Sequence, residues 1–170
     1  YIGLGIMGKP MVKNLMAAEH SIVFYARKAN VIKEISSIGG RYVDNIPEIS
    51  KSSKIIFLNL PDSDDVHEVI FSKTGLFSNL SKGSIIIDMS TISPEATKKM
   101  AKKLERKNCY LIDAPVSGGE VGAINGNLSI MVGGKKNIFN KIKHLLSVLG
   151  NNITYIGDSG SGQVTKACNQ

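Results

Sequence analysis

Tyr1-Ile2-Gly3-Leu4-Gly5-Ile6-Met7-Gly8 is the stretch that decides the fold class. Its glycines have the spacing Gly-x-Gly-x-x-Gly, which is typical of a dinucleotide-binding turn between a strand and a helix. The first glycine permits a tight turn, the second lets the backbone approach a pyrophosphate, and the third lets the helix pack closely on the strand. We therefore predict that the N-terminus of the following helix binds a cofactor pyrophosphate, in contact with Gly3, Leu4, Gly5, Ile6, Met7 and Gly8.

The residues that follow this motif support a βαβ unit. Met7, Met11 and Leu15 recur at the spacing of one helical face. A second apolar strand is expected at residues 22–25. An ordinary glycine-rich turn without a ligand is the alternative interpretation of the same pattern.

Composition limits the class of protein. A chain of 170 residues, 42% of them hydrophobic, suits one domain with at most a piece of another. No apolar run approaches the roughly 18 residues of a membrane span, and no signal-peptide pattern is present. We expect a cytoplasmic protein with no membrane partner, or one of an organelle matrix if a transit peptide was removed. Cys109 and Cys168 lack metal-ligand spacing, so we expect free thiols and no metal site.

The formal charge of +7 does not by itself indicate a nucleic-acid partner. Lysines such as those within residues 98–103 are scattered along expected helices, where a solvated face accounts for them. Aromatic residues are few and no nucleic-acid motif is present, so we expect no nucleic-acid binding. A basic surface would also attract an anionic cofactor and substrate.

Strands and helices are expected to alternate along the chain. The continuous apolar runs at 54–58 and 84–88 are typical of parallel strands buried on both faces, and 110–113 reads as another strand. Helices are expected at 29–38, from Asp62, and at 93–107, with a short strand at 41–43 and a short helix at 46–51. This alternation predicts an α/β fold with a doubly wound, mostly parallel sheet.

The residues after the second expected strand bear on the choice of cofactor. An acidic residue there usually holds the ribose 2′-hydroxyl of NAD, whereas an arginine accommodates the 2′-phosphate of NADP. This sequence has Ala26, Arg27 and Lys28, and no acidic residue between Glu19 and Glu34. We predict NADP, with NAD as the alternative, and ordinary exposed cations as the other interpretation.

Ligands of open α/β sheets bind at the carboxyl ends of the strands. The strand expected at 54–58 leads to Leu60 and Pro61, which are therefore candidates to pack near the cofactor. A plain end of a strand before a helix explains them equally well.

A second group of candidate residues follows the strand at 110–113. Asp113-Ala114-Pro115-Val116-Ser117-Gly118-Gly119 is followed by further glycines at 122, 126, 133 and 134. Bare N–H groups at this density suit a loop that surrounds an anion, and the Ser117 hydroxyl adds a donor. We predict a small carboxylate as the guest. A structural loop leading to a strand at 128–132 is the alternative.

The last part of the chain adds a candidate lysine. A helix at 137–149 and a strand at 153–156 precede a glycine-rich turn and a final helix. Lys166, Asn169 and Gln170 have the spacing i, i+3 and i+4, which places them on one helical face. Such a lysine is either solvent-exposed or directed into a cleft beside the two amides.

These residues resemble a known family. The chain is similar over essentially its whole length to the β-hydroxyacid dehydrogenases, the group of 3-hydroxyisobutyrate dehydrogenase and tartronate semialdehyde reductase, and most of all to the latter branch. Four motifs in the family order carry the resemblance: Gly3-Leu4-Gly5-Ile6-Met7-Gly8-Lys9-Pro10-Met11; Asp88-Met89-Ser90-Thr91; Asp113–Gly119 with Met131-Val132-Gly133-Gly134; and Gly162-Gln163-Val164-Thr165-Lys166 with Asn169-Gln170.

The resemblance implies a fold and a set of roles. It implies a Rossmann-type dinucleotide-binding domain at 1–158 and the start of an interdomain helix at 159–170. An all-helical C-terminal domain, absent here, would follow, and the whole protein would be a homodimer or homotetramer. For the cofactor, the resemblance implies that the first motif binds the pyrophosphate and that Leu60, Pro61 and Thr91 contact the adenosine or nicotinamide side. For the substrate, it implies that Ser117, Gly118 and Gly119 hold a carboxylate. It also implies that Lys166 is the catalytic acid/base and that Asn169 or Gln170 orients the substrate.

The implied activity is hydride transfer between NADP(H), or alternatively NAD(H), and a small 3-hydroxy or 3-oxo carboxylic acid. The pattern is most like 2-hydroxy-3-oxopropionate (tartronate semialdehyde) reductase. The alternatives are 3-hydroxyisobutyrate dehydrogenase, a glyoxylate or succinic semialdehyde reductase, and a truncated, non-catalytic dinucleotide-binding module. A lysine that is not followed by a His-Asn pair argues against 6-phosphogluconate dehydrogenase activity, and the presence of Lys166 argues against an imine reductase.

Overall fold

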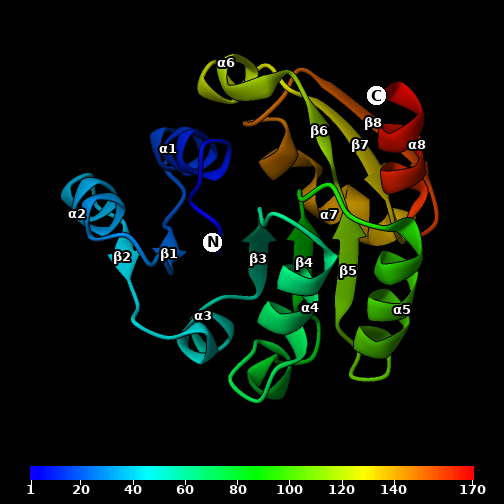
Figure 1. Cartoon of the computed structure of the whole chain (residues 1–170), viewed down its shortest axis with the longest axis horizontal. Coiled ribbons are helices and arrows are strands. Elements are labelled where there is room, and N and C mark those ends of the chain that lie inside the picture. Colours follow the sequence, from blue (N-terminus) through cyan, green and yellow to red (C-terminus); the bar gives the residue numbers. More distant parts are fainter.

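A central sheet with helices on both faces organises the chain (Figure 1). The structure is a computed structural model and describes residues 1–170. The first half of the chain contains α1 (Gly8–Ala17), β1 (Val23–Phe24), α2 (Ala29–Ser37), β2 (Arg41–Tyr42), α3 (Ile46–Ser52), β3 (Ile55–Leu58), α4 (Ser63–Phe71), a 3₁₀ turn (Phe77–Asn79) and β4 (Ile85–Asp88). The second half contains α5 (Pro94–Glu105), β5 (Tyr110–Asp113), β6 (Val116–Ser117), α6 (Gly119–Ile124), β7 (Ser129–Gly133), α7 (Lys136–Leu146), β8 (Asn152–Gly157) and α8 (Ser161–Asn169).

The strand order confirms the predicted doubly wound, mostly parallel sheet. The main sheet runs β3-β4-β5-β7-β6, with β8 paired to β7, and β1-β2 form a two-stranded sheet beside it. Ile2 forms parallel bridges to Tyr25 and to Leu58, and so joins the two sheets. Only the pairings of β7 with β5 and with β6 are antiparallel.

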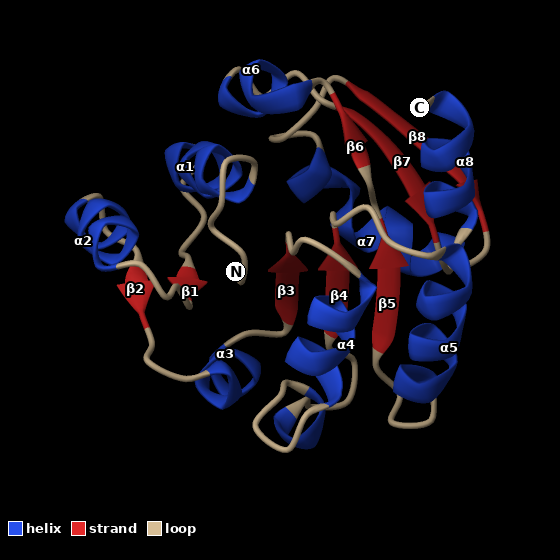
Figure 2. Ribbon diagram, in the orientation of Figure 1, coloured by secondary structure: helices blue, strands red, loops and turns tan.

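Two apolar clusters cover the two faces of the sheet. One contains buried side chains of α1, α2 and α7, such as Met11, Ile35 and Ile142. The other contains side chains of α3, α4 and α5, such as Ile49 and Met100. Figure 2 shows α4 and α5 in front of β4 and β5, with α7 behind them. No helix has both the length and the apolar character that crossing a membrane requires.

Side-chain caps fix where several helices begin, as their sequence suggests. The Asp62 carboxylate accepts the Asp65 N–H at 2.8 Å at the start of α4, and the Ser93 hydroxyl accepts the Ala96 N–H at 3.3 Å at the start of α5. Pro94 occupies the first position of α5, where the missing N–H has no intrahelical acceptor in any case.

The loop expected between Asp113 and the strand at 128–132 is a wrong prediction. The chain instead forms β6, paired with β7, and then the short helix α6. The change of direction between them uses Gly118 at φ 133° and Gly119 at φ 61°, conformations that favour glycine. The glycines of this segment therefore serve a turn into a helix and not an open loop.

Several helices and strands are also shorter than the sequence predicts. The helix expected at 137–149 is α7, which ends at Leu146, because Val148 and Leu149 make hydrogen bonds of tighter turns instead. The strands expected at 22–25 and 41–43 each contain only two residues with ladder pairing. The end of a strand expected at Tyr1-Ile2 is the single bridging residue Ile2.

The three glycines of the first motif differ in what surrounds them. A Cβ on Gly3, whose φ is 95°, would lie 2.0 Å from the Asn59 carbonyl oxygen, and one on Gly8 would lie 1.9 Å from the Gly3 carbonyl oxygen. A Cβ on Gly5 would meet no heavy atom within 4 Å. Gly3 and Gly8 therefore let the turn pack on β3 and α1, while Gly5 faces open space.

Gly8→Ala should destabilise the fold, since the added methyl group collides with backbone that a side-chain rotation cannot move. We expect a loss of about 1–3 kcal/mol in the free energy of unfolding, the usual cost of overpacking. Gly5→Ala is the matched control and should stay within about 0.5 kcal/mol of the unmodified chain. Urea unfolding of both variants measures this, and equal losses would contradict the assignment.

Candidate functional site

The glycine turn presents unpaired backbone to solvent at the start of α1. Gly5 and Ile6 are exposed, and Ile6 has 70% of its surface accessible. No side chain caps α1, and although Lys9 donates its N–H to the Gly5 carbonyl oxygen, the N–H groups of Ile6, Met7 and Gly8 donate to no backbone acceptor. These N–H groups remain available to an anion, assisted by the positive end of the helix dipole. The open space at Gly5 lets that anion approach the backbone. This turn fits the pyrophosphate of a dinucleotide.

The other predicted cofactor contacts lie along the same edge of the sheet. Ala26, Arg27 and Lys28 follow β1, and both cations are exposed and form no ion pair. Leu60 and Pro61 follow β3, and the exposed Thr91 follows β4. Because β1, β3 and β4 run parallel through the bridges of Ile2, their carboxyl ends lie at one edge.

The structure brings Lys166 and Asn169 of α8 to Ser117 of β6. The Lys166 Nζ donates to the Ser117 Oγ at 3.1 Å, and the Asn169 Nδ2 donates to the same oxygen at 3.2 Å. Lys166 is only 7% exposed and no carboxylate pairs with it. Its positive charge is therefore available to a ligand or a developing negative charge.

Gln170 lies apart from this contact. It follows the last residue of α8 as the C-cap and is exposed, and its backbone N–H donates to the Lys166 carbonyl oxygen at 3.2 Å. The backbone of Gln170 thus continues the hydrogen-bond pattern of α8, but its side chain makes no hydrogen bond to Ser117. Of the two amides left open by the sequence, Asn169 is the one that the structure places at Ser117.

Gly118 and Gly119 follow Ser117 and begin α6. Gly118 is the N-cap, and no side chain caps this helix. Both glycines are exposed, and a Cβ on Gly119 would meet nothing within 4 Å. A hydroxyl, open backbone N–H groups and an ammonium group therefore lie close together, a donor set suited to a carboxylate.

Two buried carboxylates close to this site have no role assigned to them by the sequence. Asp88 ends β4 and Asp113 ends β5, and the two residues are register partners. Asp113 Oδ1 accepts the Gly160 N–H at 2.8 Å and its Oδ2 accepts the Gln163 N–H at 3.1 Å, so it caps α8. The sequence signal was an aspartate at the end of each of two apolar runs.

The two carboxylates differ in whether both of their oxygens have hydrogen-bond partners. Asp88 Oδ1 accepts the Ser90 N–H at 3.0 Å, but its Oδ2 has no hydrogen-bond partner. Burial, opposed by hydrogen bonds from Ser90 and reinforced by the charge of Asp113, raises the pKa of Asp88 to about 7. Burial also raises the pKa of Asp113, although backbone N–H groups of α8 oppose it.

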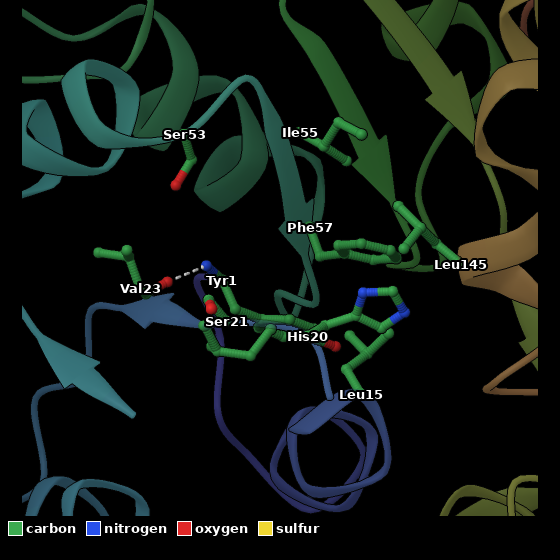
Figure 3. A pocket seen from close by; sticks show the side chains of 10 residues that line it. Tyr1, Leu15, His20, Ser21, Val23, Ser53, Ile55, Phe57 and Leu145 are labelled. Atoms are coloured by element: carbon green, nitrogen blue, oxygen red, sulfur yellow. Dashed lines mark hydrogen bonds between the residues drawn. The ribbon is translucent and has the colours of Figure 1, made fainter. Parts of the chain in front are cut away.

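A cavity of about 150 Å³ lies at the opposite end of the strands (Figure 3). Figure 3 shows Tyr1, Phe57 and Leu145 around it, with the Tyr1 amino group donating to the Val23 carbonyl oxygen at 2.6 Å. Val23 and Ile55, the first residues of β1 and β3, also line it. It contains none of the predicted site residues, so the candidate site is the open carboxyl-end edge and not this cavity.

Comparisons with known proteins show which family the chain is similar to. Residues 1–157 match the family model of the NAD binding domain of 6-phosphogluconate dehydrogenase. The chain is 44% identical over 170 residues to 2-hydroxy-3-oxopropionate reductase of Escherichia coli (strain K12), covering 100% of this chain and 58% of that protein. It is 39% identical over 169 residues to mitochondrial 3-hydroxyisobutyrate dehydrogenase of Mus musculus, covering 99% of this chain and 50% of that protein.

A solved structure shows the same arrangement of elements. Psf3 in complex with NADP+ and 2-OPP superposes with a TM-score of 0.94 at 28% identity, over 99% of this chain and 60% of that one. The chain thus spans between half and three fifths of the length of these three proteins.

Asp88→Asn should stabilise the protein at alkaline pH. The unmodified carboxyl holds a proton in the folded state up to about pH 7 but only to about pH 3.8 when unfolded, so its favourable contribution is full below pH 3.8 and is lost as the pH rises through 7. Asparagine keeps the oxygen that accepts the Ser90 N–H and carries no charge. At about pH 8 we expect the variant to be more stable by up to roughly 4 kcal/mol.

Urea unfolding between about pH 4 and pH 8 measures the gain, which should shrink steadily toward acid. Asp44→Asn, a change of an exposed aspartate, is the control and should show no such trend. A gain for Asp88→Asn that does not depend on pH would contradict the interpretation.

Proposed function

The chain belongs to the β-hydroxyacid dehydrogenase family, and from that premise we propose that it reduces a small 3-oxo carboxylic acid with NADPH, and oxidises the 3-hydroxy acid in reverse. The convergence of Lys166 and Asn169 on Ser117, at the edge that also carries the glycine turn, is the observation that supports this most directly. A nicotinamide dinucleotide supplies the hydride when it is bound.

Different residues of the chain would contact different parts of that cofactor. The free N–H groups of Ile6, Met7 and Gly8 would hold the pyrophosphate, and Leu60, Pro61 and Thr91 would line the edge beside it. Arg27 and Lys28 stand free of ion pairs where the adenosine ribose is expected. Two unpaired cations favour the 2′-phosphate of NADP over the bare ribose of NAD.

Ser117, Gly118 and Gly119 would orient the substrate through its carboxylate. The hydroxyl and the uncapped N–H groups of α6 offer several donors in one place, and Asn169 adds its amide. Holding the carboxylate at a fixed point restricts where the carbonyl carbon can lie, which is a positioning contribution to the rate.

Lys166 would act on the carbonyl oxygen. Negative charge develops on that oxygen as the hydride reaches the carbon, and the buried ammonium group stabilises it. The ammonium then gives up one proton, which makes the oxygen a hydroxyl and leaves Lys166 neutral. In the oxidation direction neutral Lys166 takes the hydroxyl proton as a base.

Among the small acids that fit such a donor set, we propose tartronate semialdehyde (2-hydroxy-3-oxopropionate) as the substrate. Support comes from the relative named for it, which is 44% identical, against 39% for a 3-hydroxyisobutyrate dehydrogenase. Methylmalonate semialdehyde, glyoxylate and succinic semialdehyde are the alternatives that an assay must include.

Lys166→Ala should nearly abolish turnover while leaving NADPH binding almost unchanged, because the ammonium contacts Ser117 and not the glycine turn. We expect kcat to fall at least about 1,000-fold, combining the loss of proton donation with the loss of charge stabilisation. Ser117→Ala is the comparison variant and should mainly raise KM for the acid. Initial rates and NADPH titration separate the two, and a parallel loss of rate and cofactor affinity in Lys166→Ala would overturn its role.

The function itself is tested by following oxidation of NADPH and NADH with tartronate semialdehyde. We expect turnover with a preference of at least about tenfold for NADPH, which the variant Arg27→Ala should reduce through loss of a phosphate contact. Turnover with equal use of NADH would refute the reading of Arg27. Intact NADPH binding without turnover would mean that these 170 residues are a cofactor-binding unit, and it would refute the proposed activity for them.

A further inference from the structure

Gln163 has a buried polar side chain that takes no part in the proposed hydride and proton transfer. It lies in the first turn of α8 and is only 1% exposed. Its side-chain Oε1 accepts the Ile92 N–H at 3.1 Å, and its Nε2 donates to the Ser90 carbonyl oxygen at 2.8 Å. The amide therefore binds the backbone on both sides of Thr91, which is itself exposed at the cofactor edge.

The segment that Gln163 binds is tied to the neighbouring strand end as well. The Ser90 hydroxyl accepts the Leu60 N–H at 2.8 Å. Ser90 thus connects the turn after β4 with the turn after β3, and Leu60 and Thr91 are both expected to contact the cofactor. Through one amide, α8 is attached to two of the turns at the cofactor edge.

The same helix, α8, that carries Gln163 also carries Lys166. Gln163 and Lys166 are three residues apart in α8 and so lie on nearly the same helical face. The Gln163 backbone N–H also donates to Asp113 Oδ2 at 3.1 Å, which fixes the first turn of the helix on β5. A Cβ on Gly162 would lie 2.4 Å from the Met131 carbonyl oxygen, so this turn has no room to shift toward the sheet.

We propose that Gln163 is a positioning residue that sets where Lys166 stands relative to the cofactor-binding turns. The inference rests on the proposed reductase function. Without the Gln163 amide, α8 would still be capped by Asp113, but nothing would tie its first turn to the backbone around Thr91. The ammonium group and the nicotinamide would then lose their fixed separation, and displacement by about 1 Å can cost roughly 100-fold in rate.

The test uses the variant Gln163→Met in the full chain. Methionine has a similar length and volume but can neither donate to Ser90 nor accept from Ile92. We expect kcat to fall about 10- to 100-fold while the Kd for NADPH changes less than about threefold. Thr165→Val is the matched control, because it removes a hydrogen bond that stays inside α8, from the Thr165 hydroxyl to the Ser161 carbonyl oxygen at 2.9 Å. The control should leave kcat within about twofold.

A double-mutant cycle distinguishes positioning from general damage. In the background of Lys166→Ala, Gln163→Met should cause little further loss, because its effect passes through the lysine. A full further loss in that background, or no loss in the single variant, would overturn the proposal. If Gln163→Met does not fold, Gln163→Asn, whose amide is one methylene too short to reach both partners, replaces it in the same cycle.

Amide hydrogen exchange gives a readout that does not need turnover. Gln163→Met should exchange faster at Ile92 and along α8, with α7 unchanged. An inactive unmodified protein would refute the proposed function, and the exchange result would then decide the link by itself. Unchanged exchange at Ile92 and α8 would overturn it.

Discussion

The rest of the site depends on the hydrogen bonds between the Asp113 carboxylate and the first turn of α8. This carboxylate lies at the end of β5 and accepts N–H groups of Gly160 and Gln163, so a strand end holds the first turn of α8. Burying a charge without partners is costly, and the N–H groups supply those partners while leaving α8 in one position. Glycine at 133 and 162 makes the approach possible, because a Cβ on either would lie within 3 Å of Asp113 Oδ2.

Because Asp113 holds α8 in place, Lys166 has a fixed position relative to Ser117 and to the turns at the carboxyl ends of the strands. The lysine helix meets β6 at Ser117 and meets the turn after β4 through Gln163. On the far side, Ile2 joins β1 to β3 and carries the glycine turn to the same edge. The residues predicted to contact cofactor and substrate thus come from segments far apart in the chain, and hydrogen bonds at the carboxyl ends of the strands hold these segments together.

Much of the fold could be predicted because local signals agreed with the tertiary arrangement. Asp62 and Ser93 mark helix starts, and the run of isoleucines at 85–87 marks a strand buried on both faces. The prediction of a loop is wrong between Asp113 and residue 128. Gly118 and Gly119 instead allow a reversal into α6, and pairing of Val116 with Ile130 makes a strand of two residues that no local pattern would reveal.

The sequence by itself determined the strand and helix alternation, the glycine turn, and the residue types that can bind an anion or donate a proton, because these follow from spacing and side-chain chemistry. Only the tertiary structure decided which of them meet. It placed the Asn169 amide on the Ser117 hydroxyl, to which Lys166 one turn earlier in α8 also donates. It also revealed Asp113 and Gln163 as the groups that hold α8, since a partner 50 or 71 residues away leaves no periodic trace in the chain.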